Sequence, residues 1–140
     1  MNLVDTYKQL LENIQHALKK HGYSRKVGFF YKKYEDNWGI IGFQKSTSSS
    51  NEFRIKFTIN LGVYSKAIAE ILDPTRIKLR PTVWDLHWGQ RIGLVFPEKN
   101  DKWWVIKEVY PEHTLESLDS ALNNTLCNID AIVEEETKKA

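Results

Sequence analysis

Polar side chains with hydrogen-bonding ends gather near the ends of several predicted strands in this 140-residue chain. Amide and guanidinium groups that converge at strand ends can bind a ligand, or the backbone and carboxylates of a protein partner. The same residue types are equally ordinary at turns and sheet edges, so their positions alone leave a purely solvated role open. The candidate binding residues are Gln44, Lys45, Arg54, Asn60, His87, Gln90 and Arg91.

Standard signatures of enzymatic chemistry are missing from the sequence. Gly39 and Gly42 lie inside a strand pattern rather than in a phosphate-binding loop, and no serine sits in a nucleophile elbow. Asp85 and His87 share one face of a predicted strand, but two ligands are too few for a metal site. Cys127 falls near an apolar helical stripe, where a free cysteine acts as a small hydrophobe. We therefore expect no catalytic residues, no bound metal and no cofactor.

Two adjacent tryptophans, Trp103 and Trp104, point to opposite faces of a predicted strand, so one of them must leave the core. A ring exposed beside Arg54, Lys56 and Arg91 can stack on a ligand or on an unpaired base. The simpler account of the chain's five tryptophans is that large rings cover the sheet. A net charge of only +2 disfavours nucleic acid, because neutralisation of phosphates dominates that affinity.

A strict two-residue alternation over residues 53–63 is the clearest structural signal. The odd positions carry the apolar side chains Phe53, Ile55, Phe57, Ile59, Leu61 and Val63. We expect this odd face to be buried and the even face, with Arg54, Lys56, Thr58 and Asn60, to lie in solvent. The even face is too polar for a second core, and its basic character suits an acidic protein partner.

Two amphipathic helices flank the predicted strands. Apolar residues recur at spacings of three and four over residues 3–21, and again from Thr114 onward. Residues 1–33 hold seven basic and two acidic groups, whereas residues 112–140 hold two basic and seven acidic groups. These opposite charges favour helices that lie side by side. Each helix has one apolar stripe, so together they can cover only one face of a sheet.

The expected fold class is α+β, a mainly antiparallel sheet of four to six strands with the N-terminal and C-terminal helices packed on one face. Residues 1–140 are expected to form a single domain. Further strands are predicted at 27–34, 38–45, 83–88, 92–96 and 103–109, and a short helix capped by Ser65 at 66–72. A single cysteine and no membrane-length apolar run or signal peptide favour a cytoplasmic protein without membrane association.

Four strings in the chain resemble the bacterial family catalogued as domain of unknown function 4304. They are WGIIGFQKS at 38–46, KFTINLG at 56–62, HWGQRIG at 87–93 and DKWW at 101–104. The likeness extends from the first predicted helix to the last. It implies a small α+β bacterial domain and carries over no catalytic residue and no substrate.

The expected function is that of a non-enzymatic protein-binding module, of the adaptor or immunity type, that uses the even face to hold an acidic protein surface. The comparison with adaptors and immunity proteins is an analogy from architecture. One alternative is a small-molecule or phosphate-ester binding protein or enzyme with a site around Arg54, His87 and Arg91. Another is single-stranded nucleic acid binding through exposed rings.

Overall fold

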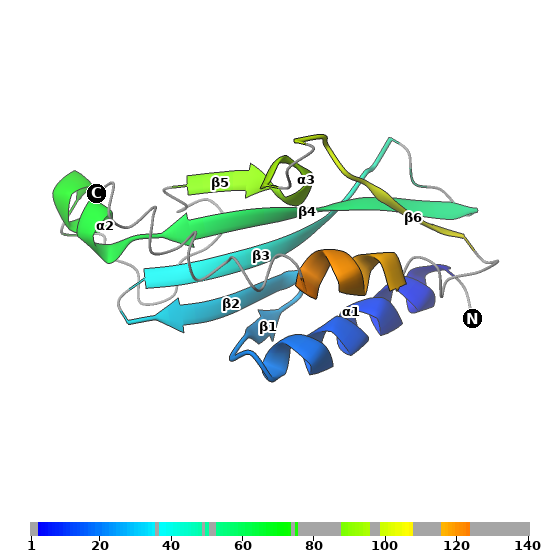
Figure 1. The fold of residues 1–140 in the computed structure, drawn as a ribbon, viewed down its shortest axis with the longest axis horizontal. Coiled ribbons are helices and arrows are strands. Elements are labelled where there is room, and N and C mark those ends of the chain that lie inside the picture. Colours follow the sequence, from blue (N-terminus) through cyan, green and yellow to red (C-terminus); the bar gives the residue numbers. More distant parts are fainter. Residues whose placement is uncertain are drawn as a thin grey trace.

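A computed structural model describes residues 3–35, 37–48, 50, 53–73, 75, 88–95, 99–107 and 116–123 (Figure 1). The elements are α1 (Leu3–Lys19), β1 (Ser24–Lys26), β2 (Phe29–Tyr34), β3 (Asn37–Lys45), β4 (Arg54–Tyr64), α2 (Lys66–Leu72), β5 (Trp88–Arg91), α3 (Ile92–Val95) and β6 (Trp104–Lys107). Residues 116–123 are also helical.

The strands form one antiparallel sheet in the order β1-β2-β3-β4-β5, and β6 also pairs with β4. β3 occupies one edge of β4. On the other edge, β6 pairs with Arg54–Phe57 and β5 pairs with Asn60–Val63. β5 and β6 therefore follow one another along the same edge of β4, with α3 between them (Figure 1).

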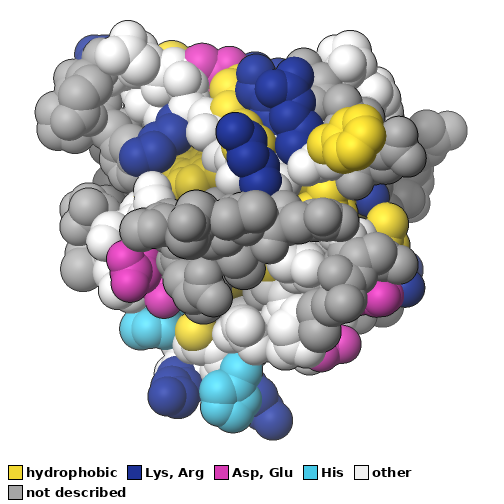
Figure 2. All heavy atoms as spheres, turned by 90° about the vertical axis from the view of Figure 1, so that its right-hand side faces the viewer, with side chains coloured by type: hydrophobic (Ala, Val, Ile, Leu, Met, Phe, Trp, Pro, Cys, Tyr) yellow, Lys and Arg dark blue, Asp and Glu magenta, His cyan; other side chains and the backbone are white. Residues whose placement is uncertain are grey.

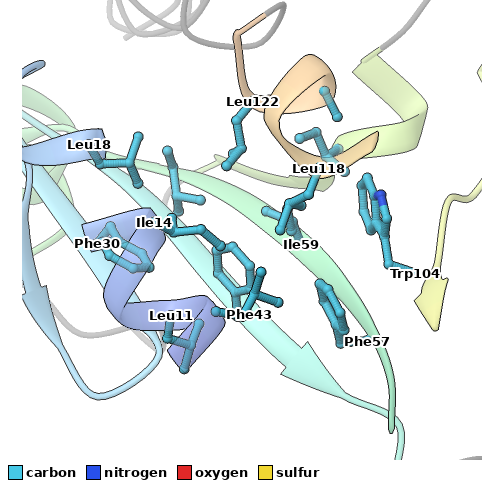
Figure 3. Close-up of a cluster of buried hydrophobic side chains, with 14 of the residues drawn as sticks. Leu11, Ile14, Leu18, Phe30, Phe43, Phe57, Ile59, Trp104, Leu118 and Leu122 are labelled. Atoms are coloured by element: carbon cyan, nitrogen blue, oxygen red, sulfur yellow. The ribbon is translucent and has the colours of Figure 1, made fainter. Parts of the chain in front are cut away.

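Both long helical segments lie against the odd face of β4, as the sequence predicts. Figure 3 shows α1 and residues 116–123 converging on the rings of the sheet. At the centre of the core, the ring of Phe57 is completely buried and stacks on Phe43 and Trp104, with centroid distances of 5.9 Å in each case. Tyr7 of α1 meets Phe57 edge to face at 5.6 Å, and its burial raises the pKa of Tyr7 to about 12. The predicted α+β class, with an antiparallel sheet, is confirmed.

Two predicted features at the ends of strands need correction. Phe53 lies outside β4 and is 72% exposed, so the buried odd face begins at Ile55. Residues 92–96 were expected to form a strand, but Ile92–Val95 is the helical turn α3. The apolar run there has too few residues to distinguish a strand from one helical turn by periodicity. Of the strand predicted at 83–88, only Trp88 lies within the described residues.

The even face of the sheet is not polar and solvated throughout, which is a further correction. Thr58 is completely buried, and its hydroxyl donates a hydrogen bond to the carbonyl oxygen of Lys102 at 2.6 Å. The register places Ile40 opposite both Tyr31 and Gly62 on this face, and Tyr31 and Ile40 are buried as well. The even face thus has buried regions as well as exposed ones.

Replacement of Phe57 by alanine should lower the free energy of unfolding by about 3–5 kcal/mol, because it removes a buried ring stacked on two others. Phe53→Ala is the matched control and should cost under about 0.5 kcal/mol, because its ring is exposed. Urea denaturation of both variants measures the difference. Equal losses would contradict the assignment of the core face.

Val27 should be a site where glycine stabilises the protein. It has a φ of 57° in the β1–β2 turn, a left-handed conformation unfavourable for a β-branched residue, and it is 79% exposed. Val27→Gly should therefore raise the free energy of unfolding by about 1 kcal/mol, whereas Val27→Ala should gain less. Denaturant titration of the two variants and the parent tests this, and a less stable glycine variant would refute it.

Candidate functional site

A hollow of about 650 Å³ lies on the even face of the sheet, across β3, β4 and β5. Gly62 of β4, which is buried, pairs there directly with Gly89 of β5, whose backbone is exposed. Beside them, the ring of Phe29 occupies the space above Gly42, where a Cβ atom would lie 2.7 Å from the ring. Three adjacent strands thus carry glycine where the alternating pattern would otherwise place side chains, and of these glycines Gly89 is the exposed one.

Three predicted site residues form the polar wall of this hollow. Asn60 donates a hydrogen bond through Nδ2 to Oε1 of Gln44 at 2.8 Å. Arg91 lies directly opposite Asn60 in the register of β5 with β4. Gln90 borders the hollow too, but it pairs with Leu61, so strand alternation places its side chain on the odd face. The structure therefore brings Gln44, Asn60 and Arg91 together on the even face around one cavity.

Arg91 also belongs to a cluster with Asp101 and Trp103. Its Nη1 lies 2.6 Å from Oδ2 of Asp101, and Nε1 of Trp103 donates to the same oxygen at 3.0 Å. These two interactions, the hydrogen bond from Trp103 first, lower the pKa of Asp101 below its usual value, and partial desolvation opposes them. The carboxylate therefore stays charged near neutral pH and holds the guanidinium of Arg91 in place.

Of the two adjacent tryptophans, Trp103 is the one whose ring lies outside the core. Two cations, which belong to different positions along β4, lie near this ring. The Arg91 guanidinium lies 4.9 Å from the ring centroid and the Lys56 ammonium 5.3 Å from it. Lys56 pairs with Val105, toward the start of β4, whereas Arg91 pairs with Asn60, further along the strand. Trp104 is 4% exposed and stacks on Phe57. These two cations compete with a nucleic-acid base for the Trp103 ring.

Lys45 and Arg54 do not join the hollow. Lys45 pairs with Phe57 and so lies on the odd face, where its ammonium is 5.2 Å from the Tyr7 ring. Arg54 precedes Asn60 by six residues on β4, which is a distance of about 20 Å. His87 lies outside the described residues, as do Asp85 and Cys127.

Reasoning from the sequence missed the acidic member of the site and its floor. Asp101 lies ten residues after Arg91, and its approach depends on α3 and the turn that follows, which the sequence did not reveal. Gly62 interrupts the even positions of β4, and a glycine inside a strand often marks a place where other groups approach the backbone closely. That signal could have located the hollow.

The described ranges contain neither a cluster of metal-binding side chains nor a helix that could span a membrane. Those residues contain no group of three or more His, Cys, Asp or Glu side chains placed to hold a metal ion. Their helices also lack the combination of length and apolar character needed to cross a membrane.

The fold and the hollow define a small α+β domain with helices on one face of an antiparallel sheet and a lined cavity on the other. A family model described as a domain of unknown function, DUF4304, matches residues 14–131. The chain therefore belongs to this family, as the four strings predicted. No curated protein and no solved structure shows significant similarity to it.

Gly93 of α3 fixes the position of the Arg91 cluster. A Cβ atom there would lie 2.1 Å from the carbonyl oxygen of Asn100 and 2.7 Å from the backbone nitrogen of Lys102. Gly93→Ala should push this segment away and lower the free energy of unfolding by about 1–3 kcal/mol. The Trp103 indole N–H signal in NMR should shift as its bond to Asp101 weakens. Gly89→Ala, at an exposed glycine, is the control; similar behaviour of both variants would disprove the role of Gly93.

Proposed function

We propose that the protein is a non-enzymatic binding module, of the adaptor or immunity type, that holds an acidic surface of a protein partner on the even face of its sheet. The proposal rests on the basic strip, which we define as Arg54, Lys56, Arg91 and Lys107. Lys107 lies directly opposite Arg54 in the register of β6 with β4, and Arg54 and Lys107 are exposed. Lys56 and Arg91 are partly exposed.

The basic strip groups four cations from three neighbouring strands. One of them, Arg91, is bonded to Asp101. Figure 2 faces the end of the molecule where β4 begins, and Lys and Arg side chains gather there beside hydrophobic ones. Basic side chains next to aromatic rings are typical of the energetically important parts of protein interfaces.

The length of the strip is the observation that favours a protein partner. From Arg54 to Arg91, opposite Asn60, it follows six residues of β4, or about 20 Å. One phosphate ester cannot contact both ends, which disfavours a catalytic site built on Arg54 and Arg91 together. A row of carboxylates on a folded partner can contact the whole strip, and arginine binds carboxylates through two parallel hydrogen bonds.

Charge reversal in the strip should abolish partner binding without unfolding the protein. Lys56→Glu with Lys107→Glu changes two positions outside the hollow. The control is Lys8→Glu with Lys19→Glu on α1, two exposed positions that give the same change in net charge. The partner is first captured by cross-linking to the parent protein in cells, identified and purified, and its affinity for each protein is then measured by calorimetry at several salt concentrations.

The strip variant should lose at least about tenfold in affinity, the control should stay within about twofold, and both should melt like the parent. Binding by the parent should weaken as salt rises, because exposed charges are screened. Equal losses in the two variants would show that only net charge matters. Retained affinity in the strip variant would place the partner on another surface. Either result would overturn the proposal.

A further inference from the structure

We infer that the hollow on the even face binds a small aromatic monocarboxylate, with its ring over Gly89 and its carboxylate at Arg91. This inference goes beyond the proposed function, because it concerns a cavity rather than the basic strip and requires no protein partner. Arg91 is the residue that the two surfaces share.

The size and floor of the hollow suit a flat, mostly apolar body. Its volume of about 650 Å³ falls in the range usual for small-molecule sites, roughly 300–1,000 Å³. Gly89 is exposed and carries no side chain, so a ring can approach the backbone there more closely than over any other residue type. The Phe29 ring, which is partly exposed, provides an apolar wall on the side of β2.

The polar wall supplies more donors than acceptors. The bond from Asn60 to Gln44 engages one hydrogen of the Asn60 amide and the carbonyl oxygen of Gln44. The Gln44 amide hydrogens and the second hydrogen of the Asn60 amide remain free to donate within the described structure. Arg91 uses Nη1 for Asp101 and retains donors on its other nitrogens. Such a wall favours a ligand group that carries acceptor oxygens.

The charge at this wall favours a single negative charge on the ligand. Asp101 already offsets much of the Arg91 charge, and Lys56 lies beyond Trp103, outside the lining of the hollow. A phosphate dianion would be only partly compensated, whereas a carboxylate is planar and matches the guanidinium geometry. The hollow therefore selects a carboxylate over a phosphate ester.

The test uses three probes with the same ring system: 2-naphthoate, the uncharged 2-naphthamide and the dianion 2-naphthyl phosphate. Each is titrated into the isotopically labelled full chain and followed by NMR. We expect 2-naphthoate to shift the backbone amides of Gly62 and Gly89 and the side-chain amides of Gln44 and Asn60. Its dissociation constant should be lower than that of either other probe by about tenfold or more, since it alone combines the matching charge and shape.

Three variants locate the bound probe. Arg91→Gln should weaken 2-naphthoate by about tenfold or more, because it removes the charged partner. Gly89→Leu should abolish binding by filling the hollow from an exposed backbone position. Lys56→Gln is the matched control on the same face and should bind like the parent. Because Lys56 belongs to the basic strip and not to the hollow, loss of the protein partner and loss of the probe are separable.

The inference is overturned if 2-naphthoate produces no shifts up to millimolar concentration. It is also overturned if the amide or the phosphate binds as tightly, if the shifts fall on other residues, or if Gly89→Leu binds like the parent. Should Arg91→Gln melt well below the parent, the probe series and Gly89→Leu decide the outcome.

Discussion

Burial of one ring, that of Phe57, joins the two halves of the sheet to the helical layer. At this residue β4 is paired on both edges, with Lys45 of β3 and Trp104 of β6 as register partners. The planes of Phe57 and Trp104 differ by only 17°, so β6 is held by ring stacking as well as by backbone hydrogen bonds. Since β6 contributes only four residues, this stacking gives it much of its attachment.

The position of β6 in turn determines how side chains are arranged on the even face. The segment that leads into β6 passes over Thr58, which bonds to its Lys102 carbonyl oxygen, and against Gly93 of α3. These two contacts place Asp101 beside Arg91 and Trp103 beside Lys56. The site on one face is thus a consequence of the packing on the other.

Much of the fold could be predicted because it depends on local periodicity. The alternation over residues 53–63 predicted β4 with its buried odd face, and the first helical stripe predicted α1. Ser65 was correctly predicted as the cap of the short helix α2, where its side chain accepts a hydrogen bond from the Ile68 N–H at 3.3 Å. The adjacent tryptophans predicted that one ring would leave the core, and Trp103 does.

The remaining features depend on contacts between distant segments, which no local pattern encodes. Thr58 seemed solvated because nothing in its neighbours shows that residue 102 crosses above it. Gln44, Asn60 and Arg91 were identified by residue type, but Lys45 was grouped with them although strand alternation places it on the opposite face. Ile40 and Tyr31 are buried on the even face, which a pattern read from β4 alone could not show.

The division of one sheet edge between two short strands has a consequence for how the molecule behaves in a crowded solution. The described strands at the two edges of the sheet are β1, with three residues, and β5 and β6, with four each. A long exposed edge offers unpaired N–H and C=O groups to other chains and promotes aggregation through intermolecular strand pairing. Among the described strands, α3 interrupts that edge after Arg91, so these strands present no continuous edge as long as β4. The protein can therefore keep an accessible sheet face with little risk of polymerising through its edges.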